Sequence, residues 1–203
     1  MLQDVWLAID EGRYADAEKM LRSDEELLVS RAGQMALGYL QAHTGRVGEA
    51  REVFTRLREL HRGEAWEPIA LHQLARTERL AGEYRTGLDL LAQERTLLEG
   101  LEADEHQQAV NALETGLCYL QLGEGNEARD WLERSLRQAE GAEDPEVAGH
   151  AERSLGELAL QLDNTYAAHE HFTRALAFFE EAEDRFAQQE VQAQLSELEQ
   201  PQA

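Results

Sequence analysis

Regularly spaced breaks in a helical pattern constrain the fold of this 203-residue chain more than any other feature. The breaks centre on the turn residues Gly12, Gly45, Gly82, Gly123 and Asp163, which are 33, 37, 41 and 40 residues apart. Glycine, and less readily aspartate, adopts the left-handed conformation that ends a helix. A period of this length indicates stacked helix–turn–helix repeats, because one such unit cannot bury its apolar face alone.

Side chains of matched size surround each break. A small residue follows the turn residue by five positions, a large apolar residue comes four positions later, and in four repeats another small residue precedes the turn by seven. The small residues after the turns are Ala17, Ala50, Gly87, Ala128 and Ala168, the large ones Leu21, Phe54, Leu91, Leu132 and Phe172, and the small ones before the turns Gly38, Ala75, Gly116 and Gly156. The pattern predicts two closely packed helices in each repeat, the small residue of one facing the large residue of the other.

These residues resemble the signature of the tetratricopeptide repeat family, from Leu2 to about Glu181. The positions that carry the resemblance are Gly12, Tyr14 and Ala17; Gly38, Gly45, Ala50 and Phe54; Gly82 and Tyr84; and Gly116, Tyr119, Gly123 and Ala128. The sequence departs from the family where Gly87 replaces the expected alanine, where Asp163 replaces the turn glycine, and in later repeats longer than the usual 34 residues. The extra length predicts longer helices or connections.

The resemblance implies an all-α fold, a right-handed solenoid of about five antiparallel helix–turn–helix repeats in a single domain spanning 1–203. The expected repeats are 1–22, 25–61, 67–100, 104–141 and 145–181. The expected helices are 2–11, 14–22, 25–43, 47–61, 67–81, 84–99, 104–122, 126–140, 145–162, 165–181 and 183–199. The last helix has no partner and is expected to cap the stack, with Phe186, Val191, Leu195 and Leu198 on one flank; the alternative is that the chain is a piece of a longer array.

Local signals support these boundaries. Ser23 and Glu26 have the spacing of a capping box that opens the second repeat. Pro68 and Pro145 fall where the first turn of a helix tolerates proline, and Asp144 is the expected N-cap of the helix that begins at Pro145.

Composition excludes several classes of function. The chain has 41 acidic and 19 basic residues and a net charge of −22, which predicts no direct binding to nucleic acid or to anionic lipid. No stretch approaches the roughly 20 apolar residues that a membrane span needs, and the N-terminus has no secretory signal. The single cysteine, Cys118, fits a reducing compartment. We therefore expect a cytoplasmic protein.

No pattern in the sequence indicates catalysis, a cofactor or a metal. Phosphate-binding glycine loops, HExxH, nucleophile elbows and CxxC pairs are missing. His169 and His171 are two positions apart on a helix and point in different directions, so we expect a solvated face rather than a shared ion. Cys118 lies in an apolar helix, where a buried structural thiol is the ordinary outcome.

The resemblance also implies that the first helix of each repeat lines a concave, ligand-binding surface. The turn residues provide the frame for the inward positions, which are Ala32, Met35, Tyr39 and Ala42; Ile69, His72, Arg76 and Arg79; Val110, Leu113, Leu117 and Leu120; and His150, Arg153, Glu157 and Leu160. His72, Arg76 and Arg79 share one helical face and, with His150 and Arg153, could form a positive patch that captures an acidic segment or a terminal carboxylate. The alternative is that the arginines pair with glutamates of adjacent repeats, such as Glu78 or Glu114.

A second apolar stripe, Val110, Leu113, Leu117 and Leu120, lies on the groove side of the helix expected at 104–122. Apolar surface of this kind is normally covered. A ligand helix, a second copy of the chain in a homodimer, the C-terminal helix, or altered repeat geometry could cover it.

Three hypotheses follow. The first is a non-enzymatic adaptor that binds a protein or peptide segment on its concave face. The second is a sensor or oligomerisation segment of a larger regulator resembling bacterial transcription regulators, which would need a DNA-binding module elsewhere. The third is a structural module that self-associates through the apolar stripe.

Overall fold

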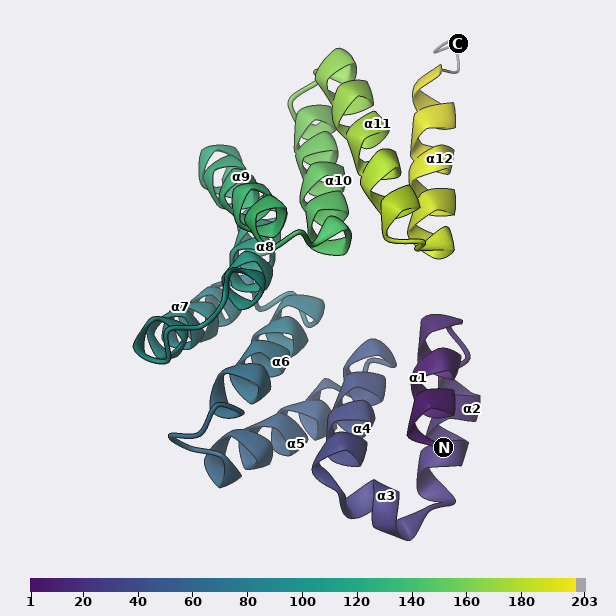
Figure 1. The fold of residues 1–203 in the computed structure, drawn as a ribbon, viewed down its shortest axis with the longest axis vertical. Helices are drawn as coiled ribbons and strands as arrows, with labels where there is room; N and C mark the ends of the chain where they lie inside the picture. Colours follow the sequence, from purple (N-terminus) through teal and green to yellow (C-terminus); the bar gives the residue numbers. More distant parts are fainter. Residues whose placement is uncertain (200–203) are drawn as a thin grey trace. The chain divides into compact units, whose positions relative to one another are not determined.

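The computed structural model describes residues 1–199, apart from the side chains of Asp10 and Glu199, and throughout this range the regular structure is helical (Figure 1). The helices are α1 Leu2–Asp10, α2 Tyr14–Arg22, α3 Glu25–Val29, α4 Arg31–His43, α5 Val47–Leu60, α6 Glu67–Leu80, α7 Tyr84–Gly100, α8 Glu105–Leu122, α9 Gly125–Gly141, α10 Pro145–Gln161, α11 Thr165–Glu181 and α12 Arg185–Glu199. The all-α helical-repeat fold is confirmed.

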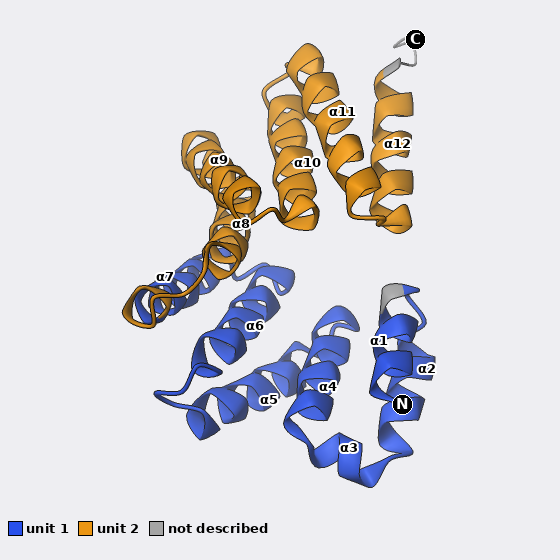
Figure 2. Cartoon of the chain, viewed as in Figure 1, with its two compact units in different colours: residues 1–97 blue, residues 98–203 orange. Residues whose placement is uncertain are grey.

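The chain forms two compact units, residues 1–97 and residues 98–203 (Figure 2). In unit 1 the first helices of the repeats are α1, α4 and α6, and their second helices are α2, α5 and α7. In unit 2 the pairs are α8 with α9 and α10 with α11, followed by α12. The expectation of one continuous domain stays a prediction.

The turn residues behave as the sequence predicts. Gly12, Gly45, Gly82 and Gly123 have φ between 69° and 81°, and Asp163 has φ 56°. An aspartate side chain tolerates this left-handed backbone better than most, because it can hydrogen-bond locally. The break therefore occurs at the same place in all five repeats.

The matched small and large residues meet across the helix pairs. A Cβ added to Gly38 would lie 2.6 Å from Phe54 Cζ, one at Gly156 2.6 Å from Phe172 Cε1, and one at Gly116 2.8 Å from Leu132 Cδ2. These separations are too short for a real Cβ, so only glycine allows each pair to pack at this distance. The large partners are fully buried.

Two local expectations are wrong. The helix expected at 25–43 is two helices, α3 and α4, separated by Ser30, whose extended backbone makes it the N-cap of α4 and whose Oγ accepts the Gly33 N–H at 3.0 Å. The N-cap of α3 is Asp24 rather than Ser23: the Asp24 carboxylate accepts the Leu27 N–H at 2.9 Å, while the Ser23 hydroxyl donates back to Met20 O. The expected cap at Asp144 is confirmed by its bond from the Val147 N–H.

Helix α12 packs against α11 through one flank. Ala187 and Val191 are buried there, and Leu195 and Leu198 pack against the same cluster. Phe186 does not share this flank as expected: it is 64% exposed, because Ala187 holds the position four residues before Val191. The other exposed side chains of α12 within residues 185–198 are polar, apart from Ala193.

Candidate binding face

The first helices of unit 1 carry a row of three side chains in contact. Trp6 of α1, Tyr39 of α4 and Arg76 of α6 each lie six residues before the turn glycine of their repeat. The Trp6 and Tyr39 rings meet edge to face, with centroids 5.7 Å apart, and the Arg76 guanidinium carbon lies 5.4 Å from the Tyr39 centroid. We call these three residues the ladder. Because α4 contacts both α1 and α6, the ladder runs across successive repeats (Figure 1).

His43, one helical turn after Tyr39, also contacts the Tyr39 ring. The two rings are stacked, with centroids 4.1 Å apart, and the Tyr14 ring lies 6.1 Å from His43. Aromatic and cation–π contacts of this kind each contribute roughly 0.5–1.5 kcal/mol beyond the buried area. Tyr39 is therefore a pre-organised, half-buried aromatic centre with two aromatic neighbours and one cation.

Trp6 and His43 belong to this site but are not among the residues predicted from the sequence. The signal was available: the frame that selects Tyr39 and Arg76 selects Trp6 when it is applied to the first repeat. His43 follows from Tyr39, because residues four apart share a helical face.

The other residues predicted in unit 1 divide into open and buried positions. Met35 and Arg79 are half-buried, and Met35 packs against the cluster that contains Phe54. His72 is buried, and its Nδ1 lies 3.1 Å from Glu94 Oε2 of α7. This contact gives His72 a structural role inside the helix pair, and its role as a ligand contact stays a prediction.

Glu78, a proposed partner of the arginines of α6, is engaged by the neighbouring repeat. Its carboxylate accepts two hydrogen bonds from Arg51 of α5, from Nε and Nη2, each at 2.6 Å. A bidentate pair of this geometry is the strongest form of arginine–carboxylate contact. Arg51, rather than Arg76 or Arg79, is therefore the partner that the structure records for Glu78.

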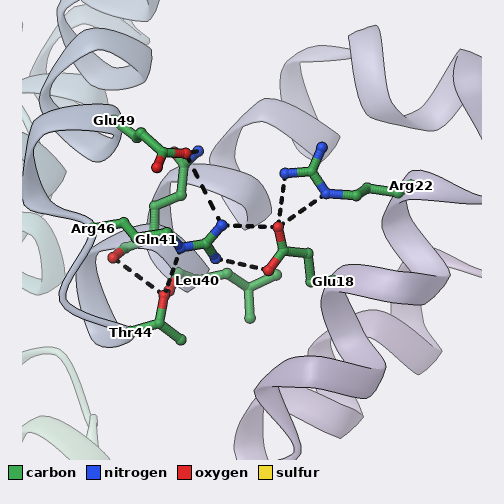
Figure 3. Close-up of polar contacts among 7 residues, drawn as sticks. All are labelled: Glu18, Arg22, Leu40, Gln41, Thr44, Arg46 and Glu49. Atoms are coloured by element: carbon green, nitrogen blue, oxygen red, sulfur yellow. Dashed lines mark hydrogen bonds and ion pairs between the residues drawn. The ribbon is translucent and has the colours of Figure 1, made fainter.

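An ion network joins α2 to the α4–α5 turn (Figure 3). Arg46 donates from Nη1 and Nη2 to the two oxygens of Glu18 at 2.9 and 2.7 Å, and Arg22 donates to Glu18 Oε1 at 2.7 Å. Gln41 donates to Glu49 at 2.9 Å on the same side. The hydrogen bonds from Arg46 lower the pKa of Glu18 below its usual range and raise that of Arg46. The network thus joins the second helix of the first repeat to the turn that follows α4.

The apolar stripe of α8 is largely covered within unit 2. Leu113 packs with Val147, Ala151 and other buried residues of α10, and Leu120 packs with Leu158. Leu113 and Leu120 are buried, whereas Val110 and Leu117 keep partial exposure at the margins of the same clusters. Of the covers considered from the sequence, packing between successive repeats is the one that the structure shows for most of this stripe.

The basic residues predicted in unit 2 are engaged by its own side chains. Arg153 donates to Glu190 of α12 at 2.7 Å and lies 3.9 Å from Glu157. The His150 ring meets the Phe179 ring edge to face at 5.0 Å. Since the proposed positive patch draws residues from both units, its assembly stays a prediction.

The described residues contain no group of three or more His, Cys, Asp and Glu side chains that could hold a metal ion. Within residues 1–199 no helix combines the length and apolar character needed to cross a membrane.

No protein-family model matches this sequence, and no curated protein sequence matches it. Solved structures do match. A Podosopora anserina putative kinesin light chain with nearly identical TPR-like repeats aligns with TM-score 0.63 and 18% identity, over 81% of this chain and 83% of that one. BtubC (BKLC) from P. vanneervenii aligns with TM-score 0.62 and 14% identity, over 98% and 91%. Bacillus thuringiensis PlcR, solved with the peptide PapR7 and DNA, aligns with TM-score 0.75 and 13% identity, over 98% and 72%. The fold is TPR-like.

Proposed function

We propose that this chain is an interaction module that holds a peptide or protein segment against the ladder face of unit 1. The observation that carries the proposal is the ladder itself. Three successive repeats place large side chains at the same position, in mutual contact and half exposed. Tryptophan, tyrosine and arginine are the residue types enriched where a few side chains dominate binding energy.

The geometry suits an extended segment. Helices of successive repeats lie about 8–10 Å apart, a distance that an extended chain spans in about three residues. A ligand running across α1, α4 and α6 would meet Trp6, Tyr39 and Arg76 in turn. An apolar side chain would contact Trp6, and a carboxylate would accept hydrogen bonds from Arg76.

Selection from a displayed random-peptide library, followed by titration of the selected peptides, tests this proposal. We expect Arg76→Glu and Tyr39→Leu each to weaken binding by about tenfold or more. Arg129→Glu, an exposed substitution on α9 with the same charge change, is the matched control and should leave binding unchanged. Peptides that bind both ladder variants as tightly as the unmodified chain would sink the proposal.

The likeness to PlcR along nearly the whole chain supports a second candidate, a peptide-responsive segment of a regulator. This candidate also uses the ladder face but adds a response to the ligand. A selected peptide that changes the molar mass measured by light scattering favours it, and binding without such a change favours a simple adaptor.

A further inference from the structure

A second surface of unit 1 lies at the N-terminal ends of α4 and α6, away from the ladder positions in sequence. The Arg31 guanidinium carbon, at the start of α4, lies 3.8 Å from the Trp66 ring centroid, just before α6. The Trp66 ring lies 6.3 Å from the His61 ring, at the end of α5. These contacts join three segments distant in sequence into one edge, which we call the α4–α6 edge.

The edge exposes large apolar side chains. Val29, two residues before Arg31, is 76% exposed, and Leu60, next to His61, is 70% exposed. Single exposed apolar residues are common on protein surfaces. Here, however, two of them flank a half-buried tryptophan that already carries an arginine, and tryptophan and arginine recur at the energetic centres of interfaces.

The edge also carries two exposed arginines, Arg31 and Arg62, beside the exposed carboxylates of Glu59 and Glu64. Glu64 lies 2.8 Å from His61, and Glu67 lies 3.5 Å from Arg58 and accepts the Gly63 N–H, so internal contacts engage these two carboxylates. Arg31 and Arg62 are exposed, and neither forms an ion pair among residues 1–199. In a chain with net charge −22, two arginines without an ion-pair partner in the described part of the chain favour the binding of a negatively charged partner.

We propose that the α4–α6 edge binds an acidic protein segment that carries apolar side chains. The carboxylates of the segment pair with Arg31 and Arg62, and its apolar side chains cover Val29, Leu60 and the open part of Trp66. An anionic membrane meets the repulsion of the whole acidic chain, whereas a short segment feels mainly the charges within a Debye length of about 8–10 Å. The site is independent of the ladder and of the proposed function.

Fluorescein-labelled synthetic peptides test the proposal on the full chain. The probes are an acidic peptide with leucines, the same peptide with leucines replaced by serines, and a basic peptide with leucines. We expect only the first to bind. The double variant Arg31→Glu/Arg62→Glu should weaken it by about tenfold or more, and Glu59→Arg, which reverses an exposed charge beside Leu60, should strengthen it. Arg76→Glu should leave it unchanged, which separates this site from the ladder.

Several results would overturn the proposal. The edge variants, with unchanged circular dichroism, could bind the acidic apolar peptide as well as the unmodified chain, or that peptide could fail to bind at all. Loss with Arg76→Glu instead would assign the peptide to the ladder face. Cosedimentation with phosphatidylserine vesicles that depends on Arg31 would point to a membrane, and self-association that depends on Arg31, seen by light scattering, would point to a second copy.

Discussion

The two units share one repeat plan but differ in charge. Unit 1 has 17 acidic and 13 basic residues, a net charge of −4, whereas unit 2 has 24 acidic and 6 basic residues, a net charge of −18. In unit 1, arginines join one helix pair to the next, as Arg46 does with Glu18 and Arg51 with Glu78. In unit 1, ion pairs thus link successive repeats, and the ladder face carries two aromatic rings and an arginine.

Unit 2 also joins its helices by ion pairs, such as Arg153 with Glu190, and adds a second close glycine–phenylalanine contact. Its longer α10–α11 pair has two glycine–phenylalanine contacts: a Cβ on Gly149 would lie 2.7 Å from Phe179, and one on Gly156 would lie 2.6 Å from Phe172. Gly149 lies seven residues before Gly156 on α10. The longer helices of this repeat thus add a second glycine–phenylalanine contact to the one at Gly156. A methyl added at Gly149 should therefore destabilise unit 2, and loss of the Arg46–Glu18 ion pair should destabilise unit 1.

The largest expected effect tests what the units share. Phe54→Ala in unit 1 and Phe172→Ala in unit 2 each empty a fully buried position facing a glycine. Both should lower the free energy of unfolding by about 3–5 kcal/mol, as measured by urea denaturation. A loss below about 1 kcal/mol at either position would contradict a shared plan.

Gly149→Ala tests the added contact of unit 2. The new methyl would overlap Phe179, and we expect a loss of about 1–3 kcal/mol in the free energy of unfolding. Gly48→Ala on α5, where a Cβ meets nothing within 4 Å, is the matched control and should stabilise by up to about 1 kcal/mol. If both alanines stabilise, the close approach of α10 and α11 is not a constraint.

Arg46→Met tests the use of charge in unit 1. Glu18 has a lowered pKa in the folded state, so its ion pairs stabilise the fold above its ordinary pKa of 4.5, and this contribution is lost as the pH falls through the folded pKa. The variant should lose about 1 kcal/mol near neutral pH, and the difference should shrink below pH 4.5. Urea denaturation across this range measures it. A difference that persists in acid would mean that Arg46 acts through packing.

The smallest effect concerns the turns of unit 2 between repeats. Glu143 adopts φ 53°, a left-handed conformation that costs a residue with a side chain roughly 1–2 kcal/mol. Glycine removes this strain, but it also increases the conformational entropy of the unfolded chain, which offsets part of the gain. Glu143→Gly should therefore stabilise the fold by about 0.5 kcal/mol. Glu143→Gln, which removes only the charge, separates strain from electrostatics in thermal unfolding. Equal stabilisation by both would assign the effect to charge.

The fold was predictable because its rules are local. Turn conformation, small–large matching and caps such as Asp144 depend on residues close in sequence. The break at Ser30 also has a local signal, because serine is a preferred N-cap residue and here it directly precedes Arg31. The sequence does not show which side chains of different helices contact each other. Here His72 lies beside Glu94, Arg51 binds Glu78, and Leu113 packs with Val147. Inward position alone therefore does not separate a ligand contact from a core residue.

The emission of Trp6 provides the most direct test of the ladder as a binding face. In a chain that carries Trp66→Phe and Trp131→Phe, Trp6 is the remaining tryptophan. A peptide selected by the unmodified chain should shift the Trp6 emission saturably, with the dissociation constant found by polarisation of the labelled peptide, and Tyr39→Leu should weaken both readouts together. Saturable polarisation without any change at Trp6 would show that the segment binds elsewhere and would contradict the account.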